Sequence, residues 1–352
     1  VRMRRRNVAP IGSGSKPDAD VRSTTTEIAD SVDYDDRDDG ISPSAVFRGL
    51  GCLLTVTTTL YYFATPANLK KRNTSLSGPY GPPNAEFDWC ENNYHAFSQI
   101  AEPVNTFSSL LYILQPLLFL GLHRRMKLPR EAPFCLASVA LIGVGSTLFH
   151  ATLRYHMQLA DELPMLALVL GAVCGLLRFT WPQLASLPSR VFSILFVGLS
   201  SALLATDRLD DTTGEEQLIH KACRGIMTCA FSACFLYIFY STAQLSSDDA
   251  QTLRKRSAPY GVWSPPGLFR RQFVIWIASI VGWIADILCC AALQNLPFGM
   301  PFPQLHGLVW HGGSALGLHY IMVLLIWHQR LADGFSPKTK LWLGFLPYLV
   351  EE

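Results

Sequence analysis

The chain has 352 residues, of which 49% are hydrophobic and only 16% are charged, whereas an average soluble domain carries about 25% charged residues. The 29 lysines and arginines nearly balance the 27 aspartates and glutamates, and the resulting net charge of +2 excludes the strongly basic surface that nucleic-acid binding requires. Apolar residues are concentrated in runs of about 17 to 22 residues, each long enough to cross a bilayer as a helix. The composition therefore predicts an all-α integral membrane protein.

The N-terminal part of the chain differs in composition from the rest. Residues 1–45 have no apolar periodicity and end in the acidic run 30–39, so we expect a disordered tail. Residues 46–64 form an apolar run that is interrupted by Arg48. By its length this run is either an additional transmembrane helix or a shallow membrane anchor. Residues 65–352 then form the main domain.

Seven stronger apolar runs follow, and each predicts one membrane-spanning helix. Within hydrocarbon every backbone polar group must be hydrogen-bonded inside its own segment, which favours helices over other structures. The runs cover residues 104–122, 133–151, 162–180, 191–206, 222–241, 272–293 and 306–327. We therefore expect a seven-transmembrane helix bundle, with 46–64 as the extra N-terminal membrane segment.

The distribution of basic residues predicts the orientation of this bundle. Loops that follow the odd-numbered runs are richer in lysine and arginine, for example Arg124, Arg125, Lys127 and Arg130 after the first run. By the positive-inside rule such loops stay in the cytosol. We expect a cytosolic C-terminus and a lumenal or external start of the first run.

A group of acidic and amide residues precedes the first strong run. Three carboxylates lie within fifteen residues, and amide side chains lie among them: Asp88, Glu91, Asn92, Asn93, Glu102 and Asn105. Carboxylate, amide and backbone carbonyl oxygens are the ligands that Ca²⁺ prefers. The alternative interpretation is a solvated helix cap.

Histidine, serine and carboxylate residues occur at the predicted lumenal ends of several runs. Ser146 and His150 share one helix face, Asp161 and Glu162 open the third run, and His306 and His311 open the last, with His319 two turns further on. Three neutral imidazoles are a typical ligand set for zinc. A carboxylate such as Asp161 nearby would accept a proton from water, and Ser146 would donate a hydrogen bond to an oxyanion. The alternatives are helix capping by the carboxylates and helix–helix hydrogen bonding by the histidines.

The sequence resembles the alkaline ceramidases, intramembrane amidases with seven helices that belong to a superfamily including the adiponectin and progestin receptors. The resemblance covers residue 78 to the C-terminus. It is carried by residues 88–94 (DWCENNY), 100–102 (IAE), 105–106 (NT), 145–146 (GS), 149–153 (FHATL), 157–165 (MQLADELPM) and 343–349 (LGFLPYL).

This resemblance implies hydrolysis of the amide of ceramide to a sphingoid base and a fatty acid, in the endoplasmic reticulum or Golgi, with ceramide and sphingoid lipids as partners. It also implies a role for individual residues. Zinc is held by His150, His311 and His306, the catalytic residues are Asp161 and Ser146, and calcium is bound by Asp88, the Trp89 backbone carbonyl, Glu91, Asn93 and Glu102. It further suggests a disulfide from Cys90 to Cys290, which matches better than Cys289. No protein partner is implied.

One feature departs from the family pattern, which has two histidines four residues apart and tryptophan before the second. His306 and His311 are five residues apart, which on a regular α-helix places them about 140° apart, so both cannot face one metal ion. An irregular segment before the helix or a π-bulge would accommodate the extra residue. Otherwise His319 is the reserve ligand, or the extra residue is an error in the gene model.

Two alternative functions remain open at this stage. Without a third ligand the chain would be an inactive receptor-like or scaffold protein on the same fold. A transporter is disfavoured because the polar residues cluster at one face, whereas a transport path continues through the midplane of the membrane.

Overall fold

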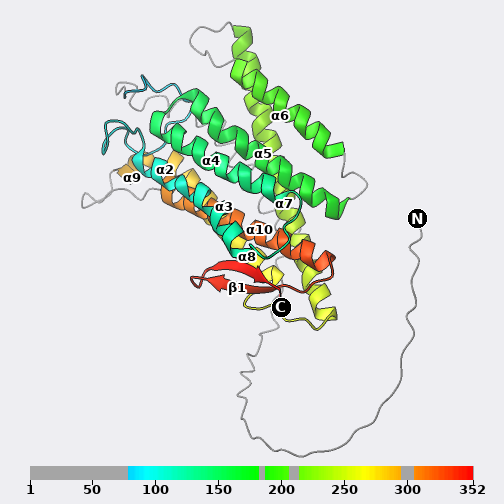
Figure 1. The fold of residues 1–352 in the computed structure, drawn as a ribbon. Coiled ribbons are helices and arrows are strands. Elements are labelled where there is room, and N and C mark those ends of the chain that lie inside the picture. Colours follow the sequence, from blue (N-terminus) through cyan, green and yellow to red (C-terminus); the bar gives the residue numbers. More distant parts are fainter. Residues whose placement is uncertain (1–77, 182–186, 206–213, 295–304, 352) are drawn as a thin grey trace, which may run out of the picture. The chain divides into compact units, whose positions relative to one another are not determined.

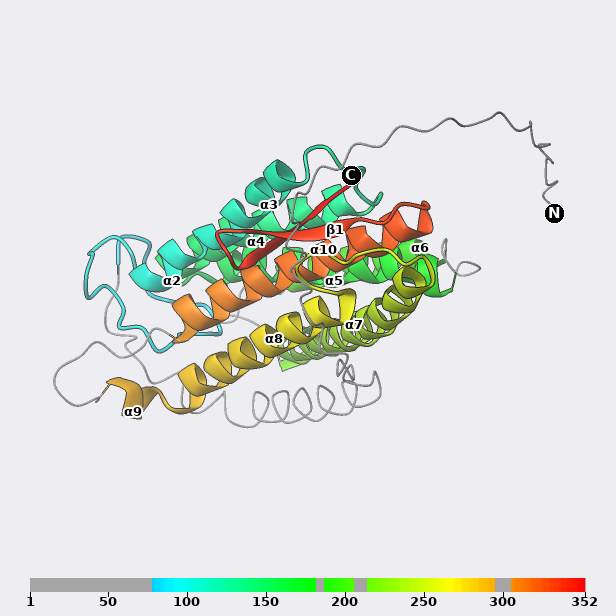
Figure 2. The same cartoon turned by 90° about the horizontal axis from the view of Figure 1, so that it is seen from below.

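The computed structural model describes residues 78–181, 187–205, 214–294 and 305–351. The expectations for the tail at 1–45 and the membrane segment at 46–64 lie outside these residues. The helices and strands are α2 (Pro103–Ser108), α3 (Leu110–Leu122), α4 (Ala132–Thr152), α5 (Tyr155–Thr180), α6 (Leu187–Ala205), α7 (Gly214–Lys255), α8 (Pro265–Leu288), α9 (Cys290–Gln294), the π-helix η3 (Leu305–His311), α10 (Gly312–Ala332), β1 (Lys338–Trp342) and β2 (Leu346–Val350). The long helices lie side by side in a bundle (Figures 1 and 2).

The predicted class of an all-α integral membrane protein is confirmed. Among the described residues, six helical segments are long and apolar enough to cross a membrane, and they are 103–122, 132–152, 155–180, 218–255, 265–288 and 305–332. The predicted run at 191–206 corresponds to α6, whose apolar part Arg190–Ala205 is shorter than the six. Helix α5 begins seven residues before the predicted run, since 155 precedes 162, so Asp161 and Glu162 lie within the helix and do not open it.

Many large apolar side chains on the outer faces of the helices have no protein neighbour to cover them. Leu117 is 62% exposed, Val274 is 63% exposed and Ile194 is 74% exposed. Exposed apolar surface on this scale is typical of a protein whose solvent is lipid. Inside the bundle a continuous apolar core includes Leu166, Leu176, Phe239 and Trp327, each of which is at most 1% exposed.

Helices α4 and α5 are antiparallel and joined by a very short turn. Leu153, which is fully buried, adopts the left-handed conformation with φ of 49° and ends α4. Its carbonyl accepts hydrogen bonds from the backbone N–H groups of Asn84 and Ala85. This turn therefore ties residues 84–85 to the end of the bundle at which α4 finishes and α5 starts.

The closest approach between α4 and α5 occurs at Gly145. A Cβ atom at this position would lie 2.1 Å from the carbonyl oxygen of Ala160 and 2.6 Å from the backbone nitrogen of Asp161. Neither backbone atom can move without moving α5. The absence of a side chain at Gly145 therefore allows Ser146 and Asp161 to lie on neighbouring backbones.

The C-terminal residues form a small antiparallel hairpin that the sequence did not predict. Strands β1 and β2 pair from Lys338 with Val350 to Trp342 with Leu346. Two histidines bond this hairpin to the bundle through hydrogen bonds. His123 Nε2 accepts a hydrogen bond from the Leu349 N–H at 3.2 Å, and His319 Nε2 donates to the Pro347 carbonyl at 2.8 Å.

We expect His123 to make stability depend on pH. Burial lowers the pKa of His123 to about 4 from its ordinary value of 6.5, and the neutral ring accepts a hydrogen bond from the Leu349 N–H. The neutral His123 ring contributes fully to the free energy of unfolding above pH 6.5, and this contribution is lost as the pH falls toward 4. The loss amounts to about 2 kcal/mol at pH 5. Thermal unfolding of the wild type and of His123→Gln checks this: the wild type should lose melting temperature relative to the variant between pH 7 and 5. Parallel curves would contradict it.

Substituting Gly145 should force α4 and α5 apart. We expect Gly145→Ala to lower the free energy of unfolding by about 1–3 kcal/mol, the usual cost of overpacking. The matched control is Gly121→Ala in α3, where a Cβ atom meets nothing within 4 Å; there alanine should be neutral or slightly stabilising. Thermal melts of the two purified variants measure the difference, and equal melting temperatures would refute the close-approach argument.

Candidate active site

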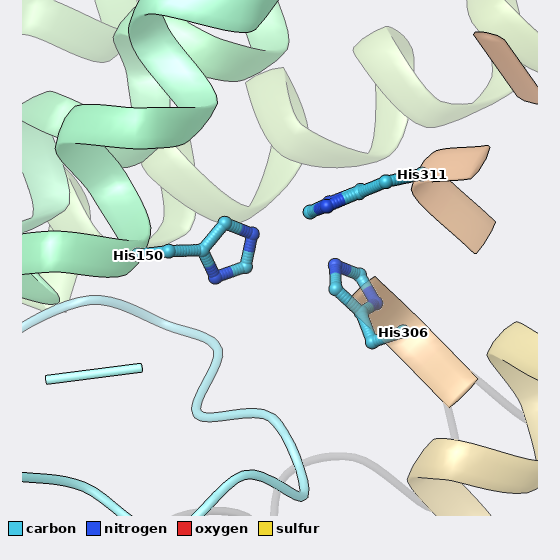
Figure 3. A group of neighbouring side chains, drawn as sticks. All are labelled: His150, His306 and His311. Carbon is cyan, nitrogen blue, oxygen red and sulfur yellow. The ribbon is translucent and has the colours of Figure 1, made fainter. Parts of the chain in front are cut away.

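Three histidines from two distant parts of the chain converge at one point. His150 lies in the last turn of α4, and His306 and His311 lie in η3. One ligand atom from each lies within 4.8 Å of those of the other two, and all three side chains are buried. Figure 3 shows the rings turned toward a common centre. Within the described ranges this is the one group of three histidine, cysteine or acidic residues with such spacing, and it could hold a metal ion.

The π-helix accounts for the five-residue spacing between His306 and His311. Hydrogen bonds in a π-helix run from residue i to i+5, so a residue five positions along returns to nearly the same face. The ring centroids of His306 and His311 are 4.7 Å apart. Of the alternatives that the sequence left open for this spacing, the structure has the π-helix. The reserve residue His319 lies elsewhere, bonded to the C-terminal hairpin.

Two of the histidines are oriented by partners on the side of the ring away from the centre. His150 Nδ1 lies 2.5 Å from Glu102 Oε2, and His150 Nε2 is buried without a hydrogen-bond partner. His311 Nδ1 lies 2.8 Å from Ser108 Oγ. A carboxylate or hydroxyl on the outer ring nitrogen is the usual way in which a protein fixes the tautomer of a metal-ligating histidine.

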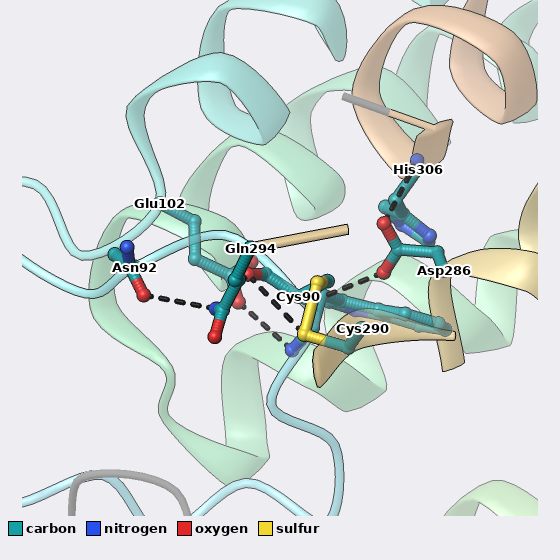
Figure 4. The surroundings of a disulfide bond; sticks show 8 residues. Cys90, Asn92, Glu102, Asp286, Cys290, Gln294 and His306 are labelled. Atoms are coloured by element: carbon teal, nitrogen blue, oxygen red, sulfur yellow. Dashed lines mark hydrogen bonds between the residues drawn. A yellow bond between two sulfur atoms is a disulfide. The ribbon is translucent and has the colours of Figure 1, made fainter. Parts of the chain in front are cut away.

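His306 is held by stacking and through its backbone. Its ring lies against the Trp89 indole with centroids 3.7 Å apart, and its Nδ1 is buried without a hydrogen-bond partner. The His306 N–H donates to Asp286 Oδ1 at 3.4 Å, while Asp286 Oδ2 accepts from the Cys90 N–H at 3.0 Å (Figure 4). Sequence reasoning missed Asp286, although a carboxylate inside an apolar run was a signal for it.

Cys90 and Cys290 form a disulfide, the pairing that the resemblance suggested, with Cα atoms 5.3 Å apart. Cys289 is a free, exposed cysteine. Figure 4 shows Gln294 beside this bond, and its Nε2 donates to the Cys90 carbonyl at 2.8 Å. The acidic segment is therefore covalently attached to the start of α9, directly after the end of α8.

The residues of the expected calcium site lie in this segment, next to the histidines. Glu91 accepts from the N–H groups of Val104 and Asn105 in the first turn of α2, and Asn93 Nδ2 donates to Asp88 Oδ1 at 3.0 Å. Asn93 Oδ1 is buried without a hydrogen-bond partner. Burial raises the pKa of Glu91 to about 7 and that of Glu102 to about 8.

A cavity of about 280 Å³ extends from the histidines into the apolar interior. Asp161 and Ser146 line it together with His306 and His311. Ser146 Oγ lies 3.0 Å from Ser109 Oγ, whose single proton is shared between Ser146 Oγ and the Asn105 carbonyl. Most other lining residues are apolar, among them Val139, Leu166, Phe235, Trp276 and Ile280. The arrangement places nitrogen ligands, a carboxylate and a hydroxyl at one end of a space suited to a lipid.

Comparison with known proteins agrees with this chemistry. Residues 81–350 match the family model described as Ceramidase. The chain is 25% identical to alkaline ceramidase 3 of Mus musculus, over 78% of this chain and 95% of the relative. It is 27% identical to the alkaline ceramidase of Arabidopsis thaliana, again over 78% and 95%, and 26% identical to alkaline ceramidase YPC1 of Saccharomyces cerevisiae, over 72% and 79%. The chain belongs to the Ceramidase family.

Proposed function

We propose that this protein is a zinc-dependent amidohydrolase that cleaves the N-acyl amide of ceramide within the membrane. The observation that carries the proposal is the buried cluster of three histidines at the polar end of an apolar cavity, in a chain of the Ceramidase family. The alkaline ceramidase relatives support the substrate class. Hydrolysis adds one water across the C–N bond, giving a fatty acid and a free sphingoid base.

The residues fit a zinc ion. Three imidazoles leave one tetrahedral position open, and His150 Nε2 and His306 Nδ1 are buried nitrogens that lack a partner. A zinc ion there would act as a Lewis acid that polarises the amide carbonyl and makes water more acidic. Glu102 and Ser108 keep the outer ring nitrogens of His150 and His311 occupied, so their inner nitrogens point to the centre.

The chain's own groups supply the proton transfer and the stabilisation of charge. Asp161 lines the cavity and is assigned as the base that removes a proton from water and later delivers it to the leaving nitrogen. Ser146 donates its hydroxyl proton to the oxyanion that develops on the former carbonyl oxygen. The apolar walls hold the two hydrocarbon chains and exclude bulk water from the polar end.

We further assign calcium to Asp88, the Trp89 carbonyl, Glu91, Asn93 and Glu102. Two features support this assignment. The Asn93 Oδ1 atom is buried without a hydrogen-bond partner, and the pKa of Glu91 is raised first by burial and further by the neighbouring carboxyls of Glu102 and Asp286. A divalent cation would favour the ionised form of each carboxyl. Because this segment carries Trp89 and Glu102, its order should control the positions of His306 and His150.

The segment that carries the disulfide is assigned to the lumen of the endoplasmic reticulum or Golgi, with the C-terminus in the cytosol. Disulfides persist in oxidising compartments, and the lysine- and arginine-rich loops at the opposite end of the bundle favour the cytosol. The substrate would then enter sideways from the bilayer.

Substitutions at the site should separate metal binding from turnover. We expect His311→Ala to lose both zinc and hydrolysis, because a buried ligand is removed. Asp161→Asn should keep one zinc per chain and lose about 10²- to 10⁴-fold in turnover, the usual contribution of a general base. Elemental analysis of detergent-purified protein and release of sphingoid base from ceramide measure the two quantities.

The matched control is His319→Gln, which changes a buried histidine in the same helical segment that bonds to the C-terminal hairpin. It should retain zinc. Full zinc occupancy in His311→Ala would contradict the proposed ligand set, and folded wild-type protein without zinc or turnover would favour the receptor-like alternative.

Removal of calcium should destabilise the protein. At a calcium concentration 100 times the Kd, binding adds about 3 kcal/mol to the free energy of unfolding. We therefore expect a calcium-selective chelator to lower both the melting temperature and the activity of the wild type, and to have little effect on Asp88→Asn. Glu131→Gln, at the distant start of α4, is the control and should respond as the wild type does. A melting temperature of the wild type that is unchanged by the chelator would count against the site.

A further inference from the structure

A second polar feature lines the cavity, and the mechanism above does not use it. Arg224 of α7 lies between Glu162 of α5 and Glu86. Its Nη2 atom is 3.1 Å from Glu162 Oε1 and 2.7 Å from Glu86 Oε2, and its Nη1 contacts Glu162 Oε2. Gln158 Nε2 also donates to Glu162 Oε1, at 2.9 Å, and His220 Nε2 lies 2.8 Å from Glu86 Oε1. Gln158 of α5 and Arg224 of α7 thus hold the Glu162 carboxylate directly, and Glu86, itself bonded to His220 of α7, holds Arg224 in turn.

Glu162 and Arg224 lie in the wall of the same cavity as Asp161 and the histidines. Asp161, Glu162 and Arg224 are the acidic and guanidinium side chains among its lining residues. An ion pair in such surroundings is weak evidence for a role in stability, since desolvation offsets much of the attraction between the charges. Ionisable residues retained inside membrane proteins are candidates for a functional role.

The Glu162 carboxylate keeps capacity for another donor. A carboxylate accepts about four hydrogen bonds through its two oxygens. Oε1 accepts from Gln158 and Arg224, whereas Oε2 accepts from Arg224 Nη1. The Glu162 side chain is 20% exposed and lines the cavity. Glu162 Oε2 can therefore accept a hydrogen bond from a hydroxyl group of a bound molecule.

The chemistry of the substrate requires such an acceptor. In a ceramide the amide nitrogen is on C2, and hydroxyl groups are on C1 and C3, one bond to either side. When the amide lies at the histidine cluster and Asp161, these hydroxyls lie within a few ångströms of it and cannot reach bulk water. A hydroxyl buried without a hydrogen-bond partner would weaken binding. The cavity wall near Asp161 must therefore accept a hydrogen bond from it.

We propose that Glu162, held in place by Arg224, is the specificity-determining residue that accepts a hydrogen bond from the primary hydroxyl of the sphingoid base. The assignment rests on the proposed ceramidase function and identifies which part of the substrate the site recognises. A lipid amide that lacks this hydroxyl leaves one acceptor position of the Glu162 carboxylate unfilled inside the cavity, and the enzyme rejects it for that reason.

The test compares ceramide with 1-deoxyceramide of the same acyl chain, in which hydrogen replaces the primary hydroxyl. The full-length purified protein should show a kcat/KM about 10- to 100-fold higher for ceramide, the range expected for a hydrogen bond to a charged acceptor. In Glu162→Met, which removes the acceptor and keeps an unbranched side chain, the ratio should fall to about 3 or less through loss of ceramide turnover. A purely structural role would lower both values of kcat/KM together and keep the ratio.

The matched control is Glu131→Met. It breaks the Glu131–Arg178 ion pair, which also joins an acidic residue to an arginine of the bundle but lies outside the cavity lining. This variant should keep the wild-type ratio. Equal kcat/KM of the wild type for the two lipids would overturn the assignment of Glu162 alone, and this comparison needs no variant to fold. Failure of the zinc-loaded wild type to cleave either lipid would overturn the ceramidase function and this assignment with it.

Discussion

The organisation of the polar end depends on the hydrogen bonds of the Glu102 carboxylate. Oε2 is 2.5 Å from His150 Nδ1 and 3.1 Å from Asn105 Nδ2, and Oε1 accepts from the Trp89 N–H. Three separate parts of the chain meet at this one buried group: the segment before α2, the start of α2 itself and the end of α4. A side chain that is 0% exposed tolerates little movement, so displacement of any one part disturbs the others.

The second constraint is the approach of η3 to these same elements. The His311 ring is bonded to Ser108 of α2, and the His306 backbone is bonded to Asp286 of α8. Gly307 lies between His306 and His311 in the chain, and a Cβ atom at this position would be 2.9 Å from Asn105 Oδ1. The π-helix is therefore packed on both sides, which explains how a helix type that is rare in isolation is retained at this position.

The sequence predicted which residues lie together at the site better than it predicted their packing. The histidines, Asp161 and Ser146 belong to short motifs, and the five-residue spacing of His306 and His311 left a π-bulge as one of several alternatives. Asp286 bonds to Cys90, 196 residues away, and Arg224 pairs with Glu162, 62 residues away, and no local pattern reports such contacts. The positions of the membrane helices followed from hydropathy, whereas the C-terminal hairpin is stabilised by His123 and His319, which look like ordinary helix residues.

The π-helix η3 also determines how two histidines with this spacing can face one point. Inserting one residue beside a ligand in a regular α-helix rotates every later side chain by about 100°, which would move His311 away from the centre. Here His306 and His311 lie in a π-helix, and the regular helix α10 begins directly after it. A π-helix can therefore turn two histidines that are five residues apart toward one centre. A search that demands a fixed histidine spacing would discard this chain, although its three imidazoles converge.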